Sequence, residues 1–157
     1  MKIVLLTVGK TSQKNIEEEI LLYSKRLSHY TDFELQEIPS LKISTKISQS
    51  ELKKSEGQMI MKYLNSSDYV VLLDENGKSY SSIDFSKKIE KFMLNSFKRV
   101  VFVIGGAFGF SDELYSCCNE KLSLSNMTFS HQMVRLFFVE QLYRAFTIIN
   151  NEKYHHQ

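Results

Sequence analysis

Residues 99–105 (RVVFVIG) and 68–74 (DYVVLLD) are two nearly continuous apolar runs that contain mostly β-branched or aromatic side chains and leucine. Short apolar runs without a polar alternation are typical of strands that are buried on both faces. Such strands form the centre of a parallel sheet whose two faces are covered by helices. These two segments therefore predict the middle of a parallel β-sheet.

The rest of the chain alternates regularly around these two runs. Two further stretches have the composition of strands, at residues 2–8 (KIVLLTV) and 33–39 (FELQEIP). Longer segments with helical spacing separate the four strands, at about 13–30, 48–64 and 82–97. This alternation predicts an α/β fold, in which a parallel sheet is flanked by crossover helices.

Length and composition limit the class of protein. The 157 residues are 43% hydrophobic and 24% charged, which is typical of a single globular domain over 1–157. No apolar run approaches the roughly 20 residues of a membrane span, and no signal-peptide cleavage site follows the N-terminal run. Cys117 and Cys118 are the only cysteines, and two adjacent thiols predict neither a disulfide nor a metal cluster. A reduced, cytoplasmic location is expected. The net charge of +2 is too small to indicate a nucleic-acid partner by itself.

The loops at the carboxyl ends of parallel strands are the expected place for a ligand. After the fourth strand the chain continues as IGGAFGFSDE (104–113), in which Gly105 and Gly106 allow close approach of the backbone to a ligand. Neither of the glycine spacings that bind phosphates is present. Ser111 is a good N-cap, and the two carboxylates that follow it would repel a phosphate. The loop therefore favours a ligand without phosphates, such as S-adenosylmethionine.

Two other loops are expected at the same edge of the sheet. LDENGK (73–78) contains the tight-turn dipeptide Asn76-Gly77, which on its own predicts an ordinary surface turn. LSLSNMTFSHQ (122–132) offers both hydrogen-bonding and apolar side chains, from Ser125, Asn126, Met127, Thr128 and Phe129. Spacing alone slightly favours an ordinary strand-to-helix connection there, with Ser130 as the helix cap.

Four motifs taken together resemble one family. They are LDENGK (73–78), FVIGGAFG (102–109), LSLSNMTFSHQMVRLFFVEQLYRAF (122–146) and the terminal YHH (154–156). The chain resembles the RlmH family, the small bacterial SPOUT methyltransferases that methylate N3 of a pseudouridine in large-subunit ribosomal RNA. The resemblance runs from the first strand to the last residues, and the third motif is long and, in combination with the others, highly specific.

The resemblance implies a fold, a cofactor and an oligomeric state. SPOUT enzymes have a parallel α/β sheet whose C-terminal part threads a loop to form a deep trefoil knot, a rare exception among protein chains. They are homodimers whose knot loops bind S-adenosylmethionine, and no metal is expected. Matched by motif, the cofactor contacts fall on Leu73, Gly105, Leu124, Ser125, Asn126, Met127, Thr128 and Phe129.

The resemblance also implies a substrate. A family member methylates a pseudouridine in helix 69 of 23S ribosomal RNA, at conventional position 1915, on the assembled ribosome. The methyl group would be transferred in line, and the N3 proton must leave because the neutral imide nitrogen has no free in-plane lone pair. Two alternatives stay open: a non-catalytic ribosome-binding or assembly factor, and a SPOUT methyltransferase that acts on transfer RNA.

The last helix, expected at about 130–149, is apolar around most of its circumference. Such a helix is predicted to pack against the core on one side and against a partner subunit on the other. Glu140 and Arg144 stand at i,i+4, so they form either an ion pair on the helix surface or part of a site that crosses the dimer. His131 and Arg135 are one turn apart and are expected to face either the cofactor loop or solvent.

The tail beyond this helix carries Tyr154, His155 and His156. The resemblance favours a functional tail over a fragment of a purification tag, because family members end in Tyr-His and then usually a basic residue. His155 is the candidate for removing the N3 proton or stabilising the resulting anion, Tyr154 for holding the flipped base, and Arg144 for a further contact there. His156 stands where the family usually has lysine or arginine, and a histidine is only partly charged near neutrality. Such a tail is expected to be mobile until it meets the ribosome.

Overall fold

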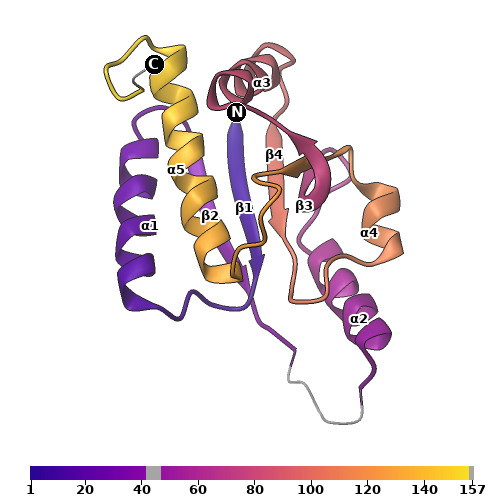
Figure 1. The fold of residues 1–157 in the computed structure, drawn as a ribbon. Coiled ribbons are helices and arrows are strands. Elements are labelled where there is room, and N and C mark those ends of the chain that lie inside the picture. The colour runs from indigo at the N-terminus through magenta and orange to yellow at the C-terminus, as the bar shows by residue number, and fades with distance from the viewer. Residues whose placement is uncertain (42–46, 156–157) are drawn as a thin grey trace.

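The structure is a computed structural model that describes residues 1–41 and 47–155 of the chain. Strands and helices alternate along this part of the chain (Figure 1). The strands are β1 (Lys2–Val8), β2 (Asp32–Ile38), β3 (Tyr69–Ser79), β4 (Arg99–Ile104) and β5 (Glu120–Ser123). The helices are α1 (Lys14–Leu27), α2 (Gln49–Met61), α3 (Ser82–Leu94), α4 (Asp112–Cys117) and α5 (His131–Ile149).

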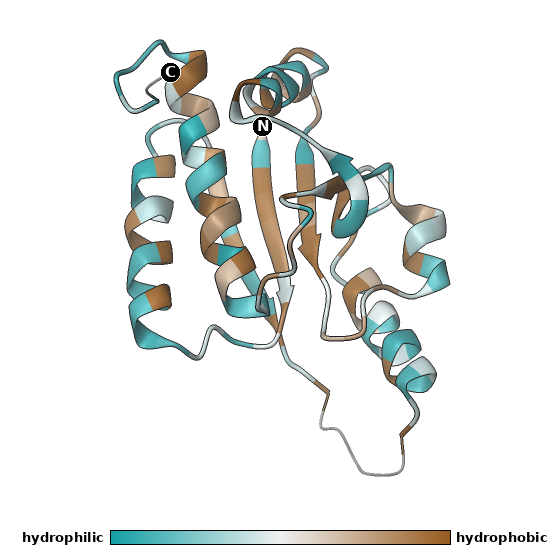
Figure 2. Ribbon diagram, in the orientation of Figure 1, coloured by the Kyte–Doolittle hydropathy of each residue, from teal (hydrophilic) through white to brown (hydrophobic). Residues whose placement is uncertain are grey.

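The strands form one parallel sheet in the order β2-β1-β4-β3-β5. Successive side chains of a strand point to opposite faces. In β1, Ile3 and Leu5 pack with residues of α1, α3 and α5, whereas Val4 and Leu6 pack with residues of α2 and α4. Figure 2 shows β1 and β4 apolar along most of their length. The predicted α/β architecture with a buried parallel sheet is confirmed.

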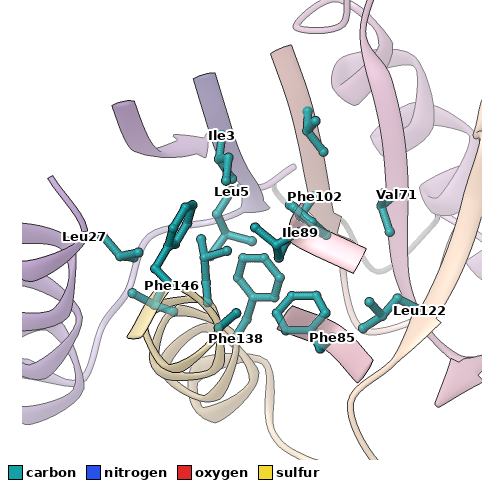
Figure 3. Close-up of a cluster of buried hydrophobic side chains, with 14 of the residues drawn as sticks. Ile3, Leu5, Leu27, Val71, Phe85, Ile89, Phe102, Leu122, Phe138 and Phe146 are labelled. Carbon is teal, nitrogen blue, oxygen red and sulfur yellow. The ribbon is translucent and has the colours of Figure 1, made fainter. Parts of the chain in front are cut away.

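Helix α5 is anchored to the sheet by aromatic side chains near its middle. The ring of Phe138 lies 4.6 Å from that of Phe102 in β4, and both side chains are fully buried (Figure 3). The ring of Phe85 in α3 lies 6.3 Å from Phe138, so the same cluster also holds α3. Burying one phenylalanine contributes roughly 1.5–3 kcal/mol. Phe137 is 36% exposed, so the two adjacent phenylalanines do not share the core face.

The third strand is longer than the sequence predicted. It was expected to end at Asp74 and to be followed by a tight turn, but β3 continues to Ser79 through an irregularity in its pairing with β5. Both Leu73 and Lys78 pair with Leu122, so the residues between them bulge out of the ladder. Gly77 lies so close to β5 that an added Cβ would be 2.5 Å from the backbone nitrogen of Leu122. Glycine is therefore needed at position 77 so that the backbones of β3 and β5 can approach each other, and not for a surface turn.

The predicted caps begin the helices at the carboxyl edge of the sheet. Ser111 Oγ accepts a hydrogen bond from the Leu114 N–H at the start of α4, at 3.4 Å. Ser130 Oγ accepts one from the Met133 N–H at the start of α5, also at 3.4 Å. Both helices thus begin where local capping chemistry favours a helix start.

We expect Gly77→Ala to destabilise the protein by about 3 kcal/mol or more, because the new Cβ would press on backbone that cannot move without separating β5 from β3. Gly109→Ala is the matched control. Its φ of +77° strains an alanine by roughly 1–2 kcal/mol, but a Cβ there would have no neighbour within 4 Å. Urea unfolding at a fixed protein concentration measures both variants. Equal losses would contradict the close approach of the two strands.

Candidate active site

A cavity of about 480 Å³ opens where β3, β4 and β5 approach the carboxyl edge of the sheet. Most of its wall comes from three segments, residues 73–76, 104–110 and 123–129. A cavity of this volume is in the usual range for small-molecule sites. The three loops that the sequence predicted to meet therefore do meet, and they enclose a space of useful size.

Seven of the eight predicted cofactor-binding residues line this cavity: Leu73, Gly105, Leu124, Ser125, Met127, Thr128 and Phe129. Asn126 is exposed and is not among the lining residues. The last segment is shaped by its own hydrogen bonds. Ser123 Oγ donates to the carbonyl oxygen of Ser125, and the Met127 N–H donates to Ser125 Oγ, each at 2.9 Å. This segment is therefore a folded loop rather than a simple extended connection.

Tyr115 of α4 and Asp74 of β3 meet at the cavity wall, and the sequence did not indicate this contact. The Tyr115 hydroxyl donates to one oxygen of Asp74, and the Asn76 N–H donates to the other at 2.7 Å. Burial first, and then the Asp74 carboxylate, raises the pKa of Tyr115 to about 12. The phenol therefore stays neutral near pH 7. A carboxylate directly after an apolar strand is a signal that could have suggested Asp74 as a site residue.

The electrostatics of the cavity suit a ligand without phosphates. Asp74 and Glu75 contribute two carboxylates, and none of the described lining residues is a lysine or an arginine. His131 also lines the cavity, and burial, followed by the charge of Arg135, lowers its pKa. The imidazole is therefore neutral near pH 7. A wall that contributes carboxylates and no described lysine or arginine disfavours anions and favours cations.

The two glycines after β4 are needed for packing of the protein itself. An added Cβ on Gly105 would lie 2.9 Å from Cε1 of Phe110, and one on Gly106 would collide with the carboxylate of Glu56 in α2. The sequence predicts that glycine is needed here to admit a ligand. In the structure, both glycines are needed because Phe110 and Glu56 occupy the space of a side chain. A branched residue at Gly105 would displace Phe110 in addition to any effect on a ligand.

Arg135 neither lines the cavity nor faces solvent, so both alternatives predicted for it are wrong. Its side chain is only 2% exposed. Its guanidinium donates hydrogen bonds to three oxygens, Val8 O (2.9 Å), Thr11 Oγ1 (3.0 Å) and Glu37 Oε1 (3.3 Å). In the preceding turn of α5, the side chain of Gln132 accepts a hydrogen bond from the Ser12 N–H at 2.9 Å and donates one to the Lys10 carbonyl at 3.3 Å. The start of α5 is thus fixed to the loops after β1 and β2.

The tail packs against α1 and α5. Glu140 and Arg144 form the ion pair that their spacing predicted. The Tyr154 hydroxyl donates to Glu140 Oε1 at 3.0 Å and lies 3.1 Å from the hydroxyl of Tyr23 in α1. The Arg144 guanidinium lies over the ring of Tyr154, and one of its nitrogens is 3.4 Å from Nδ1 of His155. We call these five residues the tail cluster.

The tail cluster differs from the expectation of a free tail. Tyr154 and His155 are both half-buried. Burial, followed by the hydrogen bonds with Tyr23 and Glu140, raises the pKa of Tyr154, so its hydroxyl is a hydrogen-bond donor near pH 7. The tail is therefore docked through residue 155 by contacts with its own chain. His156, the position where the sequence raised a question of charge, lies outside the described residues.

The cavity lies at the start of α5, where His131 and Val134 line it, whereas the tail cluster contacts α5 at Glu140 and Arg144. The helix begins beside the cavity and carries the chain to the other edge of the sheet, where the tail turns back (Figure 1). Val134 of the cavity wall and Glu140 of the tail cluster are six residues apart, or roughly 9 Å along the helix axis at 1.5 Å per residue. The predicted catalytic residues His155, Tyr154 and Arg144 are not among the residues that line the cavity in one chain.

The family model described as "Predicted SPOUT methyltransferase" matches residues 1–155. This chain belongs to the SPOUT methyltransferase family. Three relatives are each named ribosomal RNA large subunit methyltransferase H and align over the full length of both chains. They come from Christiangramia forsetii, Flavobacterium johnsoniae and Parabacteroides distasonis, and are 54%, 52% and 51% identical to this SPOUT chain.

Membership of the SPOUT family agrees with the resemblance found in the four sequence motifs and with the parallel α/β sheet. The deep knot that the family implies stays a prediction for the path of the chain. Among the described helices, none has the length and apolar character needed to cross a membrane. The described residues also contain no group of three or more histidine, cysteine, aspartate or glutamate side chains that could hold a metal ion.

We expect Arg135→Met to cost this SPOUT chain roughly 1.5–3 kcal/mol, because it removes a fully buried cation that donates to Val8, Thr11 and the partly exposed Glu37. Arg144→Met removes an arginine from the same helix, but its ion pair is partly exposed and should be worth about 1 kcal/mol or less. Chemical denaturation at one protein concentration compares the two. A smaller loss for the Arg135 variant than for the Arg144 variant would refute the assigned clamp.

Proposed function

We propose that this chain is an S-adenosylmethionine-dependent methyltransferase that methylates N3 of a pseudouridine in large-subunit ribosomal RNA. The proposed nucleotide is the one at conventional position 1915 in helix 69 of 23S RNA, acted on in the assembled ribosome in the cytoplasm. The observation that carries the proposal is the cavity where three strand ends meet, with carboxylates and no described lysine or arginine in its wall. Full-length relatives named as ribosomal RNA large subunit methyltransferases support the choice of substrate class over transfer RNA.

The residues of the cavity fit S-adenosylmethionine. The cofactor carries a positive sulfur and no phosphate, and the wall contributes Asp74 and Glu75 and no described lysine or arginine. Backbone groups of the segments 104–110 and 123–129 would hold the adenosine part. Met127, which is 73% exposed, and Phe129 would provide an apolar wall for the adenine ring. Asp74, whose two oxygens already accept hydrogen bonds, would keep its charge facing the cavity.

S-adenosylmethionine supplies an activated methyl group when it is bound. The protein must orient the pseudouridine and help the N3 proton to leave. A guanidinium can only donate hydrogen bonds, so His155 Nδ1 is the acceptor in its contact with Arg144. The ring proton of a neutral His155 then lies on Nε2. Solvent water would take the N3 proton, and the Nε2–H of His155 would donate to the resulting anion and stabilise it; this role fits the contact with Arg144 better than proton removal by His155.

Tyr154 has the chemistry of a donor and a stacking surface. Its raised pKa keeps the phenol protonated near pH 7, so it would not act as a base. Its ring already lies 4.8 Å from that of Tyr143 and under the guanidinium of Arg144. Because Arg144 is paired with Glu140, its proposed role is to orient His155 and Tyr154 rather than to hold a phosphate.

Because His155, Tyr154 and Arg144 do not line the cavity of their own chain, we place them at the cavity of a second chain in a homodimer with shared sites. A copy that packs antiparallel along α5 would bring its own tail cluster to the cavity of the first chain. The outward face of α5 offers an apolar surface for this contact. Phe137 is 36% exposed, and its ring lies 4.9 Å from that of Phe129. Both rings line a second hollow of about 360 Å³ beside the cavity.

The charge of the cavity can be tested with Thr128, an exposed lining residue. We expect Thr128→Lys to weaken S-adenosylmethionine binding about tenfold, because a second cation would be held near the sulfonium. The demethylated product S-adenosylhomocysteine lacks the positive sulfur, so its affinity should fall much less. Thr128→Gln controls for side-chain size and should affect both ligands equally. Calorimetry gives the four affinities, and an equal loss for both ligands in the lysine variant would disprove the charge argument.

The shared site can be tested by mixing two inactive proteins. A chain that ends at Lys153 should keep its affinity for the cofactor but lose methylation of ribosomes, because Tyr154 and His155 are gone. The truncated chain is then mixed in equal amounts with Thr128→Lys, at a cofactor concentration too low for the Thr128→Lys cavity to bind it. The mixture should show about a quarter of wild-type activity. Half of the dimers would be mixed, and each would have one intact site. Mass spectrometry of the target nucleotide measures the product. A truncated chain with full activity, or a mixture without recovery, would reject this arrangement.

A further inference from the structure

The last turn of α1 lies beside the tail cluster and carries an arginine whose charge is not neutralised. Arg26 has its guanidinium carbon 5.3 Å from the ring centre of Tyr23 and 5.7 Å from that of Tyr143. The ring of Tyr143 in turn lies 4.8 Å from that of Tyr154. Arg26 is therefore joined to the tail through a continuous set of aromatic contacts.

The two arginines on this side of the molecule differ in their partners. Arg144 forms an ion pair with Glu140 and is approached by His155. Arg26 makes no ion pair and donates no side-chain hydrogen bond within the described residues, while its side chain remains partly exposed. The residues three and four positions before it, Tyr23 and Leu22, carry no charge. The positive charge beside the tail cluster therefore belongs to Arg26.

Stacking on tyrosine rings fixes the orientation of a guanidinium while leaving its hydrogen-bond donors free. The contacts use its flat faces and leave the N–H groups around its edge free to donate. Two parallel N–H groups match two oxygens of a phosphate, and such charge-assisted pairs are among the stronger hydrogen bonds of proteins. RNA presents a phosphate on each side of every nucleotide, so a nucleotide held at the tail would have one within reach.

We propose that Arg26 binds a backbone phosphate of the RNA substrate, next to the nucleotide that the tail cluster holds. This inference rests on the proposed function, and it assigns to Arg26 the phosphate contact that Arg144 is not free to make. Since Arg26 lies with the tail, it serves the site whose cofactor cavity belongs to the other chain of the dimer.

Arg26 has a simpler possible role, which is to stabilise the C-terminal end of α1. A comparison with the adjacent Lys25 distinguishes this role from phosphate binding. Lys25 and Arg26 both lie in the last turn of α1, where a cation is favourable for the helix dipole. Lys25 is exposed and makes no aromatic contact among those of the described residues. Neutralising either residue removes one charge from the same helix end. Only Arg26, however, should make a defined contact with the phosphate.

The experiment compares Arg26→Gln, Arg26→Lys and the control Lys25→Gln in the full-length protein with ribosomal subunits as substrate. We expect Arg26→Gln to raise the KM for ribosomes about fivefold to tenfold, with little change in kcat or cofactor affinity. The plot of log affinity against log salt concentration should become shallower by about 0.7–0.9, the change expected for one lost phosphate contact. Arg26→Lys should recover part of the loss, and Lys25→Gln should change the slope much less.

Three other results of these measurements would contradict phosphate binding by Arg26, and a fourth would also contradict the proposed function. Equal changes for Arg26→Gln and Lys25→Gln would indicate a diffuse charge effect and reject a defined contact. A lower melting temperature with an unchanged salt slope would assign Arg26 a structural role only. If wild-type protein methylates ribosomes and Arg26→Gln does so with unchanged KM and slope, this inference fails while the proposed function stands. If wild-type protein neither binds nor methylates ribosomes, the proposed function fails, and the inference fails with it.

Discussion

The pairing of the short strand β5 with β3 is the contact on which the rest of the site depends. β5 is only four residues long, and it is held against β3 through a bulge at which Gly77 lets the two backbones approach closely. This pairing brings the loop at 123–129 beside the ends of β3 and β4. It also sets where α5 begins. A parallel sheet brings the ends of its strands to one edge. Here the end of β5 reaches that edge only because Gly77 has no side chain.

Helix α5 then determines how the chemistry is distributed. Its start is fixed by Arg135 to the loops after β1 and β2, and its middle is fixed to the sheet by Phe138. A helix fixed at these two points delivers the tail to the far edge of the sheet in a defined orientation. In one chain the tail cluster does not line the cavity, and in the proposed dimer the tail of one chain would meet the cavity of the other. The acidic cavity needs no basic residue, and the basic residues that RNA requires are free to cluster elsewhere.

Features specified by local sequence could be predicted, and features made by distant contacts could not. The buried strands, the caps at Ser111 and Ser130 and the meeting of three loops follow from short stretches of sequence. The bulge in β3 was missed because DENG has turn composition and no strand alternation. Arg135 was misjudged because a lone arginine is usually exposed, and its partners lie 98 to 127 residues away. The contact of Tyr154 with Tyr23 spans 131 residues.

The docking of Tyr154 bears on how tightly the tail would hold RNA in the proposed function. Ordering a flexible residue costs roughly 1–2 kcal/mol of backbone entropy, and an aromatic side chain adds to it. A tail that orders only on the ribosome would spend that free energy from its binding energy at each encounter. Here the hydrogen bonds to Tyr23 and Glu140 order the tail during folding instead. Under the proposed function, the RNA-binding tail would be preorganised, so more of the contact energy with RNA would appear as affinity.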